Sequence, residues 1–90
     1  MHEENLLDLA LFGVTNVDWK KLNPNKKGSI VDHASIFEQT TRMSMKILNG
    51  IMINQGADYD IRLAELSKFA KENLKRQMAA LASSGFINDN

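Results

Sequence analysis

Residues 43–66 read MSMKILNGIMINQGADYDIRLAEL, and this stretch decides the fold class. Its first half is apolar and free of proline, which predicts a helix that ends at Gly56, because glycine favours the left-handed cap of a helix. Asp58 stands where the N-cap of a following helix is expected. The connection is then only two or three residues long, and links this short join antiparallel neighbours. The stretch therefore predicts a helical hairpin.

Both helices of this hairpin are expected to be long. Ser29 and Asp32 form a Ser-x-x-Asp start signal, and only Gly50 interrupts the helical pattern from there to Gln55. The second helix continues to Ser84, with apolar residues at steps of three and four. Each helix then has about 25 residues, or about 37 Å of length at 1.5 Å per residue.

The first of these helices has an apolar surface that is too wide for one neighbour. One apolar row runs along it: Ile30, Ala34, Phe37, Leu48 and Ile51. Further apolar residues extend this surface on both sides: Ile36, Met43, Met45, Ile47 and Met52. Such a surface must be covered by more than one neighbour, so these five flanking residues are the expected interface with other copies of the chain. Methionines at these spacings also serve as core filler, and that alternative stays open.

Two short helices are expected before the hairpin. The spacing predicts a helix over residues 3–12 that Gly13 ends, and a second helix with Thr15 as its N-cap. Pro24 ends that second helix about two residues earlier, because the residue before a proline avoids helical dihedral angles.

The fold class is therefore all-α, with two short N-terminal helices followed by a long antiparallel helical hairpin. We divide the chain, within one compact domain, into an N-terminal segment at residues 1–28, the hairpin at residues 29–86 and a flexible tail at residues 87–90. Phe86 is expected to contact Leu81 across a Schellman turn at the end of the hairpin.

The composition indicates a small domain that gains from self-association. The chain has 90 residues, eleven basic and eleven acidic side chains, and no cysteine. A domain this short buries only about 60–65% of the surface of its unfolded chain, so its core is thin. Without cysteine there is no disulfide framework and no thiolate metal site. The acidic start and the lack of an apolar run of about 18 residues predict a cytoplasmic protein that does not enter membranes.

No motif predicts catalysis, a cofactor or a metal site. His2 and His33 lack helical partners at metal-binding spacing, and Asp58 and Asp60 stand where a helix start favours acids. The sequence has neither a Gly-x-Ser-x-Gly turn nor a glycine-rich phosphate loop. We therefore expect no catalytic residues, no cofactor and no enzyme; only a site built across subunits from ordinary residues would escape this reasoning.

Positive charge gathers in two places. Lys20, Lys21, Lys26 and Lys27 fall within eight residues, with no acid between them. Lysines at the end of a helix and in the following loop suit contacts with phosphates. The last helix is also basic, but its acids stand three or four residues from basic neighbours, as on a solvated face.

The sequence LALFGVT at residues 9–15 is similar to the turn of a helix-turn-helix. An apolar residue stands four positions before the glycine, a valine follows it directly, and a threonine caps the next helix. The resemblance implies that Trp19 and Leu22, six and nine positions after the glycine, face the first helix. It also implies that Thr15, Asn16 and Asp18 enter the major groove of DNA.

The order of parts resembles that of the terminase small subunits of tailed phages, which have an N-terminal helix-turn-helix, a basic loop and long oligomerising helices. The resemblance implies a non-enzymatic DNA recognition or packaging subunit. Such a subunit works as a homo-oligomer in the host cytoplasm and binds duplex DNA and a larger protein partner. DNA would then contact Thr15, Asn16 and the four lysines of residues 20–27.

An alternative function needs no nucleic acid. The chain would then be a small protein-interaction module, such as a phage or plasmid regulator, an inhibitor or a scaffold. In that case the helical hairpin binds a protein partner or another copy, and the four lysines are solvated.

Overall fold

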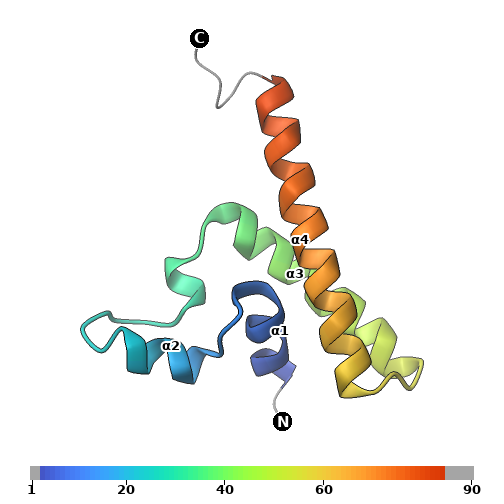
Figure 1. Ribbon diagram of the computed structural model, residues 1–90, viewed down its shortest axis with the longest axis horizontal. Coiled ribbons are helices and arrows are strands. Elements are labelled where there is room, and N and C mark those ends of the chain that lie inside the picture. Colours follow the sequence, from blue (N-terminus) through green and yellow to red (C-terminus); the bar gives the residue numbers. More distant parts are fainter. Residues whose placement is uncertain (1–2, 85–90) are drawn as a thin grey trace.

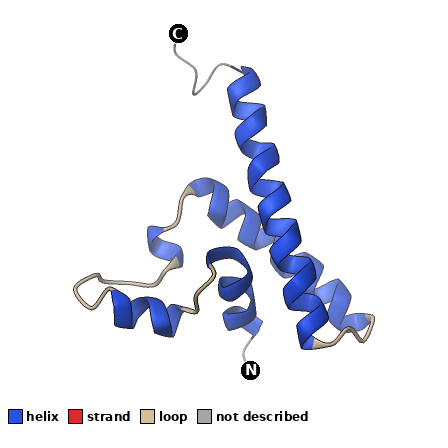
Figure 2. Cartoon of the chain, in the orientation of Figure 1, coloured by secondary structure: helices blue, strands red, loops and turns tan. Residues whose placement is uncertain are grey.

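The computed structural model describes residues 3–84, and all regular structure in this range is helical (Figure 1; Figure 2). Its α-helices are α1 (Glu3–Phe12), α2 (Asn16–Leu22), α3 (Ile36–Asn54) and α4 (Tyr59–Ser84), and a 3-10 turn, η1, spans Val31–His33. The prediction of an all-α protein is therefore confirmed. The helices α1, α3 and α4 pack together, whereas α2 and η1 stand to one side of them (Figure 1).

The limits of the two N-terminal helices agree with the sequence analysis. The helix α1 ends at Phe12, and the Thr15 hydroxyl accepts a hydrogen bond from the Asp18 N–H at 3.3 Å as the N-cap of α2. Two other predictions, the contact of Phe86 with Leu81 and the tail at residues 87–90, lie outside the described residues.

A tight turn joins α3 to α4. The Gly56 N–H donates to the Ile53 carbonyl at 3.0 Å, and the Ala57 N–H donates to the Met52 carbonyl at 3.0 Å. These are the two hydrogen bonds of a Schellman motif, and they place Gly56 at φ 80°, where glycine is favoured. The helix end predicted at Gly56 and the helix start after Asp58 are confirmed, and α3 and α4 pack against each other.

The helix α3 begins six residues later than the capping signal at Ser29 suggests. The Asp32 carboxylate accepts the Ser29 N–H at 2.8 Å and closes only a local turn. Ser35 is the actual N-cap: its hydroxyl accepts the Glu38 N–H at 3.1 Å, while the Glu38 carboxylate accepts the Ser35 N–H at 2.9 Å. Because this reciprocal capping box fixes the start, α3 has 19 residues rather than about 25.

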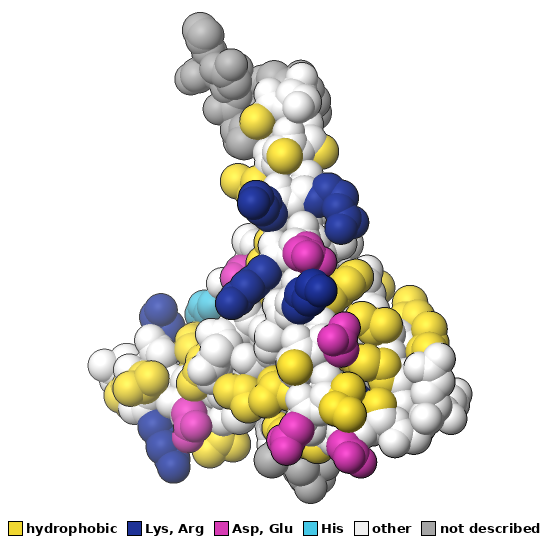
Figure 3. Space-filling model, turned by 45° about the vertical axis from the view of Figure 1, so that its right-hand side comes forward, with side chains coloured by type: hydrophobic (Ala, Val, Ile, Leu, Met, Phe, Trp, Pro, Cys, Tyr) yellow, Lys and Arg dark blue, Asp and Glu magenta, His cyan; other side chains and the backbone are white. Residues whose placement is uncertain are grey.

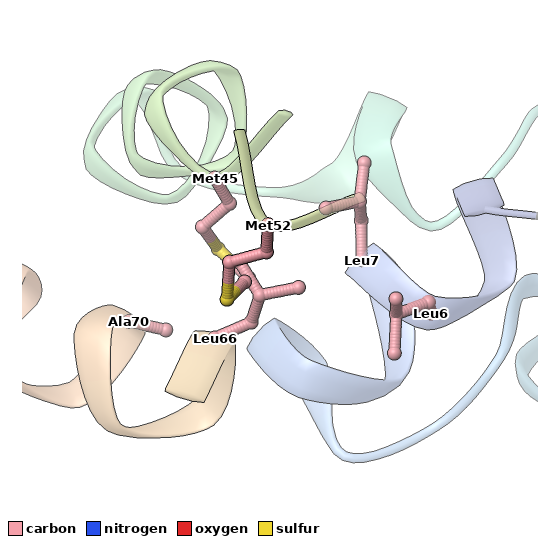
Figure 4. Packing of buried hydrophobic residues seen from close by; sticks show 6 residues of the cluster. All are labelled: Leu6, Leu7, Met45, Met52, Leu66 and Ala70. Carbon is pink, nitrogen blue, oxygen red and sulfur yellow. The ribbon is translucent and has the colours of Figure 1, made fainter. Parts of the chain in front are cut away.

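The core lies where α1 packs onto both α3 and α4. Its buried apolar side chains come in pairs from the three helices: Leu6 and Leu7, Met45 and Met52, Leu66 and Ala70 (Figure 4). Met45 is fully buried, and Met52 is 7% exposed. The prediction that Met45 and Met52 contact other subunits is therefore wrong. Their flexible side chains fill the space between the helices instead.

Two arginines hold α1 onto this core, and we call Arg42, Arg62, Glu3, Glu4 and Asp8 the α1 clamp. From α3, Arg42 Nε donates to Asp8 Oδ1 at 2.8 Å, and Arg42 Nη2 donates to Glu4 Oε1 at 2.9 Å. From α4, Arg62 Nη2 lies 3.0 Å from Glu3 Oε2. The Arg42 side chain is 13% exposed and that of Asp8 is 6% exposed. Buried charge pairing thus supplements a thin apolar core.

The described molecule is flat rather than spherical. Its principal extents are 47 × 38 × 15 Å. Its radius of gyration is 14.7 Å, against about 12 Å for a compact chain of this length. The C-terminal half of α4 extends away from the other helices (Figure 1). One copy therefore leaves much of its helix surface open.

Candidate interaction surfaces

One face of α3 is apolar and open to solvent. Ile36 is 68% exposed, Met43 and Ile47 are each 69% exposed, and Ile51 is 50% exposed. Steps of seven, four and four residues place them along one side of the helix, and we call these four residues the α3 stripe. Hydrophobic side chains gather beside the lower part of α4 in Figure 3, where the C-terminal half of α3 runs.

The opposite side of α3 completes the core. Thr41, Met45, Asn49 and Met52 are buried and recur at steps of four, four and three residues. The helix therefore has one face inside the chain and one face in solvent. The other three residues predicted at an interface lie on the solvent face, where they are accessible to another chain: Ile36, Met43 and Ile47.

The buried polar side chains of α3, Thr41 and Asn49, bind partly buried polar side chains of α4. The Thr41 hydroxyl donates to Asn73 Oδ1 at 2.7 Å and accepts from Gln77 Nε2 at 3.0 Å. Asn49 Oδ1 accepts from Arg62 Nε at 3.0 Å. Throughout the described residues, no buried side-chain nitrogen or oxygen lacks a hydrogen-bond partner. The buried side-chain polar atoms of the described core are therefore all satisfied by the chain itself.

Residues 14–34 form an arm that stands beside the packed helices (Figure 1). The arm is held together by its own contacts. Asn16 Oδ1 accepts the Ile30 N–H at 2.8 Å. The rings of Trp19 and His33 lie 5.1 Å apart between centroids, tilted by 35°. The helix α2, the loop after it and η1 therefore form one unit.

The arm departs from the helix-turn-helix pattern. Leu22 is 75% exposed, so the prediction that it packs against the first helix is wrong. Trp19 stacks with His33 of the arm. The side-chain oxygens of Thr15 and Asn16 are engaged in the α2 cap and in the bond to the loop. These two predicted DNA-binding residues therefore have structural partners within the arm.

The predicted DNA-binding lysines of the arm are all exposed: Lys20, Lys21, Lys26 and Lys27. Within residues 3–84, none of them has a carboxylate within 4.0 Å. Of the four, Lys20 influences the charge of Asp32. Hydrogen bonds from Ser29 lower the pKa of Asp32, and the charges of His33 and Lys20 add to that effect.

A second group of exposed basic side chains lies on α4: Lys68, Lys71, Lys75 and Arg76. Dark-blue side chains accordingly lie along the middle part of α4 in Figure 3. None of the four has a carboxylate within 4.0 Å in the described part of the chain. Arg62, which the sequence places near Glu65, pairs with Glu3 instead. The acids of α4 therefore leave its positive charge unpaired.

The described chain presents open surfaces rather than an enclosed site. Residues 3–84 have no pocket, and no group of three or more histidine, aspartate or glutamate residues among them is placed to hold a metal ion. No helix in this range is long and apolar enough to cross a membrane. The candidate functional surfaces are the α3 stripe and the two groups of basic side chains.

Comparisons with known proteins add no relative. No protein-family model, no curated protein and no solved structure matches the chain. The resemblance to terminase small subunits therefore depends on residues 9–15 and on the order of the parts.

Sequence reasoning missed the α1 clamp. In the folded chain, the hydrogen bond from Arg42 lowers the pKa of Glu4. Burial opposes the charge of Arg42, yet the carboxylates of Glu4 and Asp8 outweigh it and raise the pKa of the guanidinium. The available signal was Asp8, a charged residue between apolar neighbours, since such residues are buried only when paired.

Proposed function

We propose that the protein is a non-enzymatic interaction module that associates with further copies of itself through the α3 stripe. The supporting observation is the open apolar face, where four large side chains are each at least half exposed. The other face of the same helix already completes the core. Single exposed apolar residues are ordinary, but a contiguous row of them on one helix is typical of a contact surface.

Removing the α3 stripe from water would stabilise an assembly. Full burial of an isoleucine or methionine side chain gains about 1.5–3 kcal/mol. Four side chains that are 50–69% exposed therefore gain roughly 4–8 kcal/mol in each copy. Two stripes together gain roughly 8–16 kcal/mol. Association costs about 4–15 kcal/mol in lost freedom, so the net gain reaches about 8 kcal/mol, which corresponds to micromolar affinity, when that cost lies near the lower end of its range.

A second copy of the chain suits this surface. Eleven basic and eleven acidic residues give the chain no net charge, so two copies approach without net repulsion. The molecule is only 15 Å thick in its shortest dimension, so a copy laid on the stripe would cover a face that one copy leaves open.

Sedimentation equilibrium of the wild type and two variants tests the proposal. Ile47→Asn places an amide in the α3 stripe, and the matched control Leu22→Asn makes a similar change at an exposed residue of the arm. We expect the wild-type mass to rise with concentration through the micromolar range. Ile47→Asn should remain monomeric, and Leu22→Asn should behave as the wild type, with the same helical circular dichroism in all three. A wild type that is monomeric at several hundred micromolar would overturn the proposal.

A second candidate function is recognition of duplex DNA, as the resemblance to terminase small subunits implies. It is supported by the four exposed arm lysines, which lack ion pairs within the described residues. Such side chains contact phosphates without regard to base sequence. Self-association would multiply the weak contacts of one copy.

A gel-shift assay at about 50 mM salt tests DNA recognition, because phosphate contacts are strongest at low salt. A variant with all four arm lysines replaced by alanine should lose binding. A matched variant should retain it, with alanine at the four basic positions of α4: Lys68, Lys71, Lys75 and Arg76. If the wild type shifts no duplex at this salt concentration, DNA recognition is excluded and the proposed self-association is unaffected.

A further inference from the structure

Gly50 occupies a position in α3 that the fold of one copy does not explain. It lies inside the helix, is exposed and does not have a positive φ. A Cβ atom built on it would have no neighbour within 4 Å beyond the adjacent helix backbone. Alanine would therefore fit here and would favour the helix more than glycine does. Nothing within the described chain requires a glycine at this position.

Gly50 also interrupts the α3 stripe. It follows Met43 by seven residues and Ile47 by three, which places it on the same side of the helix as both. The missing side chain leaves a gap in the apolar row, where the backbone of α3 is accessible. Such a gap lets a neighbouring helix approach closely and receives a large side chain from it.

Resting on the proposed self-association, we propose that two copies form a closed two-fold dimer in which Ile47 of each copy packs over Gly50 of the other. In a two-fold contact, residue i meets residue j while j meets i, so one pair of positions supplies both contacts. Ile47 and Gly50 lie three residues apart on one face and provide one projection and one gap per copy. Met43 and Ile51 flank this pair and become covered at the same time.

The distribution of the other exposed apolar residues favours this dimer over a ring. In a head-to-tail ring, the α3 stripe would meet a second, different surface of the next copy. The remaining large exposed apolar residues of the described chain are dispersed over α2, α3 and α4: Val17, Leu22, Ile53, Ile61 and Met78. They form no second row comparable with the α3 stripe, so a contact between two stripes is the better match.

The variant Gly50→Ala tests the dimer with one methyl group. In the dilute monomer, alanine strengthens α3, so we expect the melting temperature to rise. In the dimer, the methyl group holds the partner's Ile47 away, so the dissociation constant should rise at least about tenfold, or about 1.4 kcal/mol. Because the monomer is stabilised, misfolding would not explain such a loss. An unchanged or lower dissociation constant would overturn the proposed geometry.

Cysteine pairing tests the register of the two helices, since the wild-type chain contains no cysteine. Ile47→Cys and Gly50→Cys chains are mixed and mildly oxidised, and the products are separated on a non-reducing gel. We expect disulfide-linked dimers that join the two different variants. The control mixture of Ile47→Cys with Leu22→Cys should yield none. A failure to link positions 47 and 50, or equal linking in the control, contradicts the proposed packing.

These experiments separate the dimer geometry from the proposed function. If Ile47→Asn dissociates the wild-type oligomer but Gly50→Ala does not weaken it, the α3 stripe is a contact surface and the packing of Ile47 on Gly50 is wrong. A wild-type mass of three or more copies also excludes the closed dimer. A wild type that remains monomeric refutes the self-association itself.

Discussion

Removal of the Arg42 guanidinium should strongly destabilise the fold. The variant Arg42→Met retains most of the aliphatic stem and removes both charged hydrogen bonds to α1, at 2.8 Å to Asp8 and 2.9 Å to Glu4. The Asp8 side chain is only 6% exposed and would stay buried without its cation. The expected loss therefore comes mainly from Asp8.

The size of this loss follows from the burial of the two carboxylates. Breaking a buried ion pair by removing one partner costs about 3–5 kcal/mol, because the other charge is left uncompensated. Glu4 is 58% exposed, so its share is less than about 1 kcal/mol. A domain of this length has a stability of about 5–13 kcal/mol, so the variant loses a large part of it. The melting temperature should fall by at least about 12 °C.

Thermal and urea unfolding, followed by circular dichroism, measure this effect. The control is Lys46→Met, because the Lys46 ammonium lies 3.7 Å from Glu4 and both side chains are more than half exposed. It should cost less than about 1 kcal/mol. Adding Asp8→Asn to Arg42→Met removes the stranded charge and should recover part of the stability. If Arg42→Met costs no more than Lys46→Met, the buried part of the α1 clamp does not stabilise the fold and the reasoning is refuted.

Three further predictions concern the same fold. The hydrogen bond from Arg42 lowers the pKa of Glu4 in the folded chain below its ordinary value of 4.5. The free energy of unfolding that this bond contributes at neutral pH should therefore be lost as the pH falls from 4.5 through the lowered pKa, which the urea midpoint measured at a series of acid pH values would show. Ser35→Ala removes the hydroxyl of the capping box and should cost about 1 kcal/mol in urea unfolding, whereas Ser35→Thr should retain most of the stability. Thr41→Val removes a buried hydroxyl from its partly buried partners Asn73 and Gln77 and should cost about 1–3 kcal/mol in the same measurement.

Helix ends could be predicted from the sequence where one local signal decides them. Gly56 ends α3 through its own backbone conformation, and Thr15 starts α2 through its own side chain. The predicted end of α3 and the predicted start of α2 are both confirmed. The start of α3 could not be predicted in this way, because two capping signals lie six residues apart, at Ser29 and Ser35. The structure selects Ser35, where both halves of a capping box form, and leaves Ser29 in a turn.

The open face of α3 could be predicted only in part, because both faces of this helix contain large apolar residues. Met43 and Met45 stand two positions apart, yet the first is 69% exposed and the second is fully buried. Polar residues mark the inner face: Thr41 and Asn49 are buried there and bind side chains of other helices. The sequence pattern alone would assign such polar residues to the surface. Which side of α3 faces inward is decided by hydrogen-bond partners that are distant in the sequence, so it could not be predicted from α3 itself.

The distribution of charge predicts that salt will separate the two proposed activities. Three basic residues are paired with acids of α1, and the other eight of the eleven all lie within residues 20–27 and 68–76. The α3 stripe contains no charge, so self-association should be nearly unchanged between about 50 and about 500 mM salt, where exposed charges become screened. DNA binding through the four arm lysines should weaken as salt rises. A plot of the logarithm of the association constant against the logarithm of the salt concentration should have a negative slope of at most about 4 in magnitude per copy. If self-association itself falls tenfold over this range, charged groups and not the α3 stripe join the copies.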